Sequence, residues 1–312
     1  MTLEALLVAA RAGDVRATAR LVTIVENEEP EAAALVRATY REAGRALVVG
    51  ITGPPGGGKS TLVAALVGHY RERHSQVAVI AVDPSSPFTG GALLGDRIRM
   101  RERFLDPGVF IRSLASRGAT GGLSRGTARV VDLLDALGHE VVLVETVGVG
   151  QEEIEVMRVA GTVCLVSVPG LGDDIQAVKA GIIEIADVLV VNKADRPGAD
   201  QAVADLRAMQ SLAAPRVGSW SPPIVRTTAS AGDGVADVVD AVARHAAWSR
   251  ASGDDKRRRG EAARSAVETL LREMLTRRFV EVAGHRERLD DAVAAVADRS
   301  TDPETAARDL LG

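Results

Sequence analysis

The stretch Gly53-Pro54-Pro55-Gly56-Gly57-Gly58-Lys59-Ser60-Thr61 directly follows an apolar run at 46–52. Its spacing, G-x-x-x-x-G-K-S between a predicted strand and a predicted helix, is typical of a loop that wraps nucleotide phosphates. The glycines let consecutive backbone N–H groups turn towards an anion, and the helix that follows adds the positive end of its dipole. We expect all of these residues to bind a nucleotide, with Lys59 neutralising the β and γ phosphates and Ser60 holding Mg²⁺.

The composition describes a soluble globular protein, since 46% of its 312 residues are hydrophobic and 26% are charged. A net charge of −4 argues against nucleic acid or an anionic membrane as the main partner. We see no signal peptide and no apolar stretch near the ~20 residues that span a bilayer. Together with a single cysteine, Cys164, these features predict a cytoplasmic protein.

Short apolar runs alternate with helical stretches between residues 46 and 248. The runs lie at 46–52, 77–82, 109–114, 140–145, 162–168, 187–192 and 224–228. Runs of this kind suit strands that are covered on both faces, and their alternation with helices predicts an α/β fold with a doubly wound, mainly parallel sheet of about seven strands. Ligands of such sheets bind at the carboxyl ends of the strands, which is where the motifs of this chain lie.

Four segments are expected along the chain. Residues 1–43 have helical spacing and form an N-terminal extension, and 44–248 form the nucleotide-binding domain. The polar stretch 249–260 reads as a solvated linker, and 261–312 as a helical C-terminal arm. An apolar stripe runs along the predicted helix at 261–282. Spacing alone leaves open whether that stripe packs on its own domain or on a second subunit.

The run at 187–192 ends in Asn192-Lys193-Ala194-Asp195, the N-K-x-D pattern of guanine-specific proteins. The Asp195 carboxylate can accept hydrogen bonds from N1–H and the 2-amino group of guanine, whereas adenine offers neither donor. An unpaired carboxylate costs ~1–3 kcal/mol, which is enough to discriminate against ATP. We expect Lys193 to lie against the base and to tie this loop to the phosphate loop. The turn Ser230-Ala231-Gly232 is expected to offer backbone N–H groups to guanine O6.

Carboxylates at strand ends predict the metal site. Glu145, in Glu145-Thr146-Val147-Gly148, stands where most GTPases carry the Asp of Asp-x-x-Gly. Asp83 ends the run at 77–82, and Asp96 follows a glycine-containing loop. We expect Glu145 to reach the Mg²⁺ held by Ser60, directly or through water, because hard oxygen ligands suit this ion.

The glycine of the same motif, Gly148, is expected to give its backbone N–H to the γ-phosphate. In the common pattern a water-orienting glutamine directly follows that glycine. This chain has Val149 there, and Gln151 comes two residues later. The sequence therefore predicts slow intrinsic hydrolysis of GTP, or hydrolysis completed by another residue or a partner.

Together with the phosphate loop and the guanine motif, the segments 82–86, 95–100, 145–151 and 172–181 resemble the MeaB/ArgK-type GTPases. These proteins are chaperones of adenosylcobalamin-dependent methylmalonyl-CoA mutase. The resemblance covers nearly the whole chain. It implies a client that is this mutase or a related cobalamin-dependent acyl-CoA mutase, and a homodimer formed through the arm at 261–312.

The resemblance also implies roles for residues that spacing leaves unassigned. It places Lys59, Asp83, Asp96 and Glu145 around Mg²⁺ and the phosphates. Ser60, Asp83, Asp96 and Glu145 are then the metal ligands, and Lys59, Asp96 and Glu145 are among the catalytic residues. It makes 168–181 a mobile segment in which Asp173, Gln176 and Lys179 relay the nucleotide state to the mutase, with Gln176 and Lys179 reaching the γ-phosphate.

Other functions remain open on the sequence alone. An ATP-using kinase of a basic amino-acid transport system is disfavoured by the guanine motif, and a comparison of GTP with ATP affinity separates it. A metallochaperone GTPase is disfavoured by the few Cys and His residues. A binding module that does not hydrolyse its nucleotide is separated from an enzyme by single-turnover hydrolysis.

Overall fold

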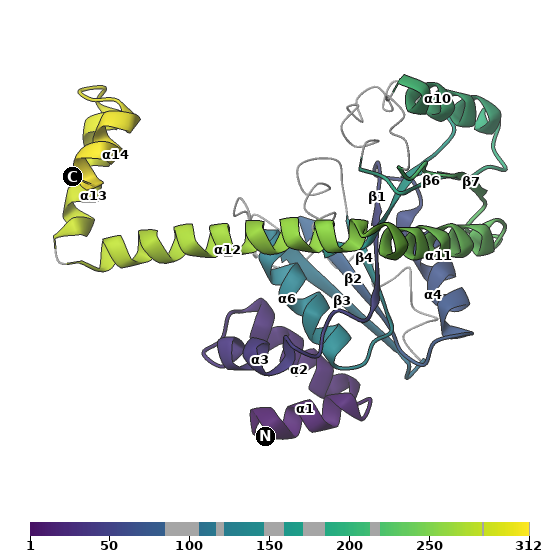
Figure 1. Ribbon diagram of the computed structural model, residues 1–312, viewed down its shortest axis with the longest axis horizontal. Coiled ribbons are helices and arrows are strands. Elements are labelled where there is room, and N and C mark those ends of the chain that lie inside the picture. The colour runs from purple at the N-terminus through teal and green to yellow at the C-terminus, as the bar shows by residue number, and fades with distance from the viewer. Residues whose placement is uncertain are drawn as a thin grey trace. The chain divides into compact units, whose positions relative to one another are not determined.

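A computed structural model describes most of the chain (Figure 1). The described residues are 1–84, 106–116, 122–146, 159–170, 185–212, 219–282 and 284–311. They fall into two compact units, Met1–Arg258 and Arg259–Gly312. Within the described ranges, none of the helices combines the length and the apolarity that crossing a bilayer requires.

The first unit is built on a seven-stranded parallel sheet. Its strands are β1 (Leu47–Thr52), β2 (Val77–Pro84), β3 (Val109–Ser116), β4 (Val141–Thr146), β5 (Thr162–Ser167), β6 (Val188–Asn192) and β7 (Ile224–Thr227). Their order, β3-β2-β4-β1-β5-β6-β7, puts β1 at the centre with β4 on one side and β5 on the other. This confirms the predicted doubly wound sheet and places the phosphate loop at the end of its central strand.

Helices bury both faces of the sheet, as the apolar character of the strands predicts. On one face, α4 (Lys59–Arg71) and α11 (Val235–Ser252) pack against side chains such as Val49 and Ile51 of β1. On the other, α2 (Val15–Glu26) and α6 (Gly122–Ala136) pack against the alternate residues of the neighbouring strands, and α10 (Ala199–Leu212) covers β5 and β6. Every residue of β4, β5 and β6 is buried.

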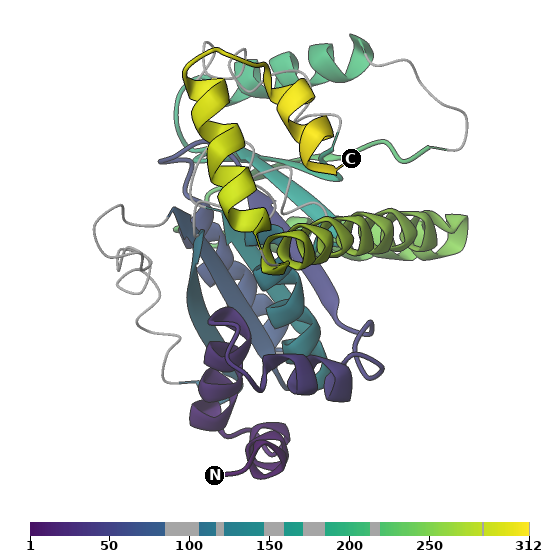
Figure 2. The same ribbon diagram turned by 90° about the vertical axis from the view of Figure 1, so that its left-hand side faces the viewer.

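The N-terminal extension forms three helices, α1 (Leu3–Arg11), α2 and α3 (Ala32–Thr39). Helices α2 and α3 lie beside α6, and α1 packs on α2 (Figures 1 and 2). Asp14 caps α2 by accepting the N–H groups of Arg16 and Ala17. The extension shares one hydrophobic core with the sheet, and Glu26 of α2 pairs at 2.6 Å with Arg112 of β3. It is therefore packed as part of the first unit.

The stretch 249–260 differs from the solvated linker that its composition predicts. It is helical except at Gly253, whose φ of +79° separates α11 from α12 (Asp254–Glu281). Ser249 is buried at the end of α11, and Arg258 belongs to the first compact unit. Two helices that meet at a single glycine thus replace the expected loop, because a left-handed glycine ends one helix without a longer connection.

The second unit is helical, as the sequence predicts. It contains most of α12, then α13 (His285–Ala297) and α14 (Pro303–Leu311). Pro303 occupies the first position of α14, where its missing N–H costs nothing. No described residue of α12 is buried, and its apolar stripe includes exposed Val267, Leu271, Met274 and Leu275.

Ionisation of Asp132 on α6 destabilises the folded state in a pH-dependent way. Burial, followed by the charge of Asp135, raises the pKa of Asp132 to about 6. The folded state therefore holds this proton more tightly than the unfolded chain, and ionisation of Asp132 costs stability above pH 6 but not near pH 4. At about 1.4 kcal/mol per pKa unit, the full shift corresponds to roughly 3 kcal/mol at pH 8. Because the side chain is only partly buried, we expect Asp132→Asn to raise the free energy of unfolding by ~1–2 kcal/mol at that pH. Urea unfolding should show this gain shrinking as the pH falls from 6 to 4.

Asp135, one helical turn away, supplies the matched control. Its carboxylate accepts the N–H groups of Gly44 at 2.6 Å and Arg45 at 2.9 Å. Asp135→Asn should therefore lower stability at pH 8, by about 1 kcal/mol. A stabilisation of equal size from both variants would show that the effect comes from net charge and not from the burial of Asp132.

Candidate nucleotide site

The phosphate loop begins where β1 ends and closes at the first turn of α4. Gly53 has a φ of +137° and Gly58 a φ of +83°, conformations that favour glycine. A Cβ atom at Gly53 would collide with the carbonyl oxygen of Val166 on β5, and one at Gly58 with the Asn192 side chain. The two glycines are therefore needed both for the turn itself and for its close packing on neighbouring strands.

Lys59 lies over this loop with only 6% of its surface exposed. Its ammonium group donates to the carbonyl oxygens of Gly53, at 2.6 Å, and Pro54, at 3.1 Å. The positive charge is thus held at the mouth of the loop and does not extend into solvent. This is the position from which a lysine can meet phosphate oxygens.

Ser60 and Glu145 meet at the carboxyl edge of the sheet although they are far apart in sequence. The Ser60 hydroxyl, in the first turn of α4, donates to Oε1 of Glu145 at 2.7 Å, and both side chains are buried. Glu145 pairs in register with Ile51 of β1, which brings it beside the phosphate loop. The structure places together two of the four residues that the sequence predicts as Mg²⁺ ligands, and their oxygens fit a hard cation.

A hydroxyl pair that the sequence reasoning missed joins the ends of the same two strands. Thr146, directly after Glu145, donates to Oγ1 of Thr52 at 3.1 Å, and both threonines are buried. Thr52 is the last residue of β1 and Thr146 the last of β4, so the bond links the carboxyl ends of these two strands. A polar residue at the end of two apolar runs is the only sequence signal for it.

Asn192, at the end of β6, joins the guanine motif to the phosphate loop. Its amide nitrogen donates to the Gly57 carbonyl at 2.9 Å. Its amide oxygen accepts from the Thr227 hydroxyl at 3.1 Å and from the Ala229 N–H at 3.2 Å. Three loops that follow β1, β6 and β7 are therefore held together through one buried side chain.

Lys193 and Asp195 complete this edge. Lys193 has a φ of +57°, and its ammonium group donates to the Gly56 carbonyl at 2.7 Å. This contact matches the expectation that the lysine ties the two loops together. Asp195 is exposed, so its carboxylate is accessible to a base.

The turn Ser230-Ala231-Gly232 lies at the same edge, after β7. The Ala231 N–H donates to the Thr228 carbonyl at 2.8 Å, and the Gly232 N–H to the Ala229 carbonyl at 3.4 Å. Two of the three N–H groups predicted to face guanine O6 thus donate within the turn. The contact to O6 stays a prediction.

Part of the predicted site lies outside the described residues. Asp96, Gly148, Gln176 and Lys179 are all in this group. Asp83 lies near the end of β2, and its backbone pairs with Ala115 of β3. Their roles stay predictions.

Comparisons with known proteins agree with this geometry. A family model described as methylmalonyl Co-A mutase-associated GTPase MeaB matches residues 18–283. A putative GTPase of Pyrococcus abyssi is 46% identical over 301 residues, which cover 96% of this chain and 93% of that protein. The mitochondrial methylmalonic aciduria type A homolog of Caenorhabditis briggsae is 36% identical over 79% of this chain and 64% of that protein.

Among solved structures, the crystal structure of an LAO/AO transport system kinase superposes with a TM-score of 0.73. It is 28% identical and covers 99% of this chain and 96% of that chain. The arrangement of sheet and helices is therefore that of a P-loop nucleotide-hydrolysing protein, as the sequence predicts.

Proposed function

This chain belongs to the MeaB family of GTPases, and from that premise we propose that it is a chaperone of an adenosylcobalamin-dependent mutase, methylmalonyl-CoA mutase or a related acyl-CoA mutase. The match to the mutase-associated family over residues 18–283 is the observation that carries the proposal. The relative named after methylmalonic aciduria supports the same direction. Hydrolysis of GTP would time the loading of cofactor and the release of inactivated cofactor.

In this proposal the nucleotide binds across the loops described above. Lys59 neutralises the phosphates from its place over the loop, and Asp195 selects guanine through its exposed carboxylate. The Ser60 hydroxyl and the Glu145 carboxylate, 2.7 Å apart, would hold Mg²⁺ together with Asp83 and Asp96. When bound, the ion supplies positive charge that stabilises the phosphate oxygens during hydrolysis.

In the proposal, residues 168–181 transmit the nucleotide state to the mutase. This stretch follows β5, so it leaves the sheet at the nucleotide edge. Neither Gln176 nor Lys179 is required for contact with the base, and both can approach the γ-phosphate when a client binds. Because Val149 replaces the usual glutamine, basal hydrolysis is slow and the mutase accelerates it.

We expect Gln176→Ala and Lys179→Ala to leave GDP affinity within a few-fold of the parent but to remove the acceleration by the mutase. The measurement is GTP turnover with and without a cobalamin-dependent mutase. Lys256→Ala, which changes an exposed lysine of α12, is the control and should be accelerated like the parent. Equal acceleration of all variants would show that 168–181 does not carry the signal.

A transport-system kinase is the second candidate, because the solved structure described above carries that title. It is separated by nucleotide preference. In titrations on the same preparation, the affinity for GTP should exceed that for ATP by one to several decades, because adenine would leave the Asp195 carboxylate unpaired. Equal affinities would favour the kinase.

The C-terminal unit is proposed to form a homodimer. The α12 stripe is apolar and exposed, with 54% to 67% of Val267, Leu271, Met274 and Leu275 accessible. A second copy of the same stripe is a partner of matching chemistry. We expect removal of 261–312 to convert a dimer into a monomer in light scattering. A full-length protein that already has the mass of one chain would contradict this.

A further inference from the structure

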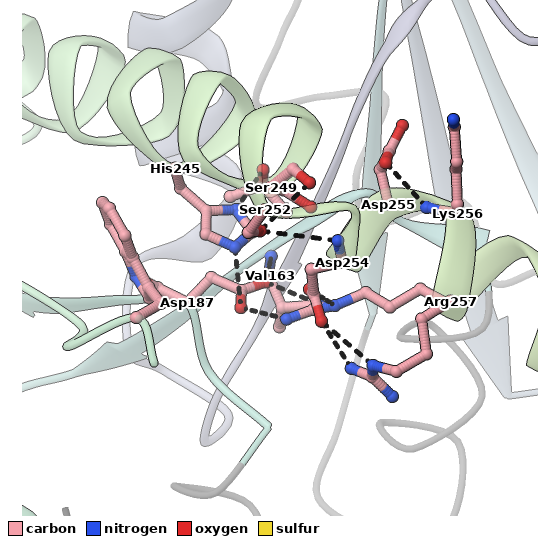
Figure 3. Close-up of polar contacts among 12 residues, drawn as sticks. Val163, Asp187, His245, Ser249, Ser252, Asp254, Asp255, Lys256 and Arg257 are labelled. Carbon is pink, nitrogen blue, oxygen red and sulfur yellow. Dashed lines mark hydrogen bonds and ion pairs between the residues drawn. The ribbon is translucent and has the colours of Figure 1, made fainter. Parts of the chain in front are cut away.

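A buried polar cluster lies at the amino edge of the sheet, opposite the nucleotide site (Figure 3). Thr162 begins β5, Asp187 directly precedes β6, and His245 lies on α11. All three are almost fully buried, with at most 3% of their surfaces exposed. Asp254 and Arg258, from the first turns of α12, complete what we call the Asp187 cluster.

Asp187 is the centre of this cluster. Its two carboxylate oxygens accept from the guanidinium of Arg258, at 2.7 and 3.0 Å. Oδ2 also accepts the backbone N–H of Val163 at 2.9 Å, and Oδ1 lies 3.2 Å from Nε2 of His245. A two-pronged pair of this kind fixes both distance and orientation, which a single charged contact does not.

Arg258 uses its planar fork in two directions. Its Nε donates to Asp254 at 2.6 Å, one turn earlier in the same helix, while the other two nitrogens reach Asp187. A lysine has no such fork. The neighbouring Arg257 also pairs with Asp254, at 2.6 Å, but its side chain is 57% exposed, against 28% for Arg258.

His245 is held as the neutral imidazole. Its Nδ1 lies 2.8 Å from the Thr162 hydroxyl, which can donate to it, and its Nε2 lies 3.2 Å from Oδ1 of Asp187. Burial lowers the pKa of His245, which keeps the ring uncharged at neutral pH. The formal charges of the cluster are then those of Asp187, Asp254 and Arg258.

Removing the charged groups of the cluster from water costs free energy, so the cluster contributes little net stability. Its geometric effect is stronger, because loss of one partner leaves a buried charge without its partner. The cluster joins the amino ends of β5 and β6. Further along, β5 carries the Val166 carbonyl that packs on Gly53, and β6 ends at Asn192, whose amide donates to the phosphate loop. The helix that leads into the second unit thus starts on the same two strands that support the nucleotide loops.

We propose that Asp187 and Arg258 are positioning residues that make the first turns of α12 an integral part of the GTPase domain, anchored to the amino ends of β5 and β6. This role is independent of the mutase and of the order in which GTP is bound and hydrolysed. It assigns a purpose to a charged pair that nucleotide binding does not use.

Hydrogen exchange of the α12 amides around 256–262 tests the proposal on the full chain. In Arg258→Met we expect these amides to exchange ~10-fold faster or more, because the first turns of the helix lose their anchor. Arg257→Met, the surface neighbour, should stay within about two-fold of the parent. Arg258→Lys should behave like Arg258→Met, since it keeps the charge but lacks the fork. Equal exchange in the Met variants at 257 and 258 would overturn the proposal.

The chain provides a second readout at the same place. It has two tryptophans, Trp220 and Trp248, and both rings lie against His245, with centroids 5.0 and 5.8 Å away. Trp220 also donates to the Asp187 carbonyl at 2.7 Å. Tryptophan emission therefore reports on the Asp187 cluster alone.

We expect the folded-state emission to shift in Arg258→Met and Arg258→Lys and to stay unchanged in Arg257→Met. Should Arg258→Met fail to fold, Arg258→Lys decides by both measurements, because it leaves no buried carboxylate without a cation. Parent-like exchange and emission in Arg258→Lys would overturn the proposal. Calorimetry with GDP should give affinities within a few-fold of the parent for all variants, which separates a loss of the anchor from damage to the nucleotide site.

Discussion

Replacement of Lys59 by alanine is expected to abolish GTP hydrolysis while the protein stays folded. The ammonium group is held over the phosphate loop by the Gly53 and Pro54 carbonyls, so its charge is in place before any phosphate arrives. A preorganised charge of this kind stabilises the transition state directly, and its loss costs several kcal/mol, or ~10²–10³-fold or more in turnover. The fold should tolerate the change, because Lys59 is the first residue of α4 and its side chain lies over the phosphate loop, outside the core clusters.

The measurement is single-turnover hydrolysis of GTP alongside a thermal melting curve. Lys256→Ala removes one positive charge from an exposed position and controls for net charge. Turnover near that of the parent, with a normal melting curve, would contradict the assignment of the phosphate loop.

Replacement of Asp195 by asparagine is expected to remove the preference for guanine. A carboxylate accepts from N1–H and the 2-amino group together, whereas an amide offers one acceptor and presents a donor to the other position. We expect GDP affinity to fall by ~10–1000-fold, the value of charge-assisted pairs. Xanthine carries an oxygen where guanine has the 2-amino group, so the same variant should gain affinity for xanthosine diphosphate.

Calorimetry with both diphosphates checks this expectation. Asp200→Asn is the control, since Asp200 is an exposed aspartate of α10 that pairs with Arg226 at the surface. GDP affinity that is the same in Asp195→Asn as in the parent would remove Asp195 from the base site.

The sheet could be predicted because its information is local. Each strand is a short apolar run, and in β4, β5 and β6 the polar residues stand only at the strand ends, where they do not obscure the pattern. The meeting of Ser60 with Glu145 could also be predicted, since Glu145 stands at the carboxyl end of β4 and Ser60 follows β1, and the carboxyl ends of these strands share one edge. These inferences need only the order of elements along the chain.

Contacts that depend on distance in space could not be predicted in the same way. Nothing near Asn192 in the sequence indicates that its amide reaches the Gly57 carbonyl, because that bond depends on how two loops pack. The prediction of a solvated linker at 249–260 was wrong for a related reason. Its Ser, Asp, Arg and Gly residues resemble a loop, and only the pairing of Arg258 with Asp187 shows why a helix forms there.

The hydrogen bonds of Asn192 also fix the distance between the two halves of the nucleotide site. The bonds of Asn192 to Gly57, Thr227 and Ala229 hold the base-reading and phosphate-holding halves of the site at one separation. A guanosine diphosphate spans that separation and gains from both halves at once, whereas guanosine or free pyrophosphate gains from only one. Because the protein and not the ligand fixes the distance, joining the two fragments in one molecule should give an affinity well above what either achieves alone.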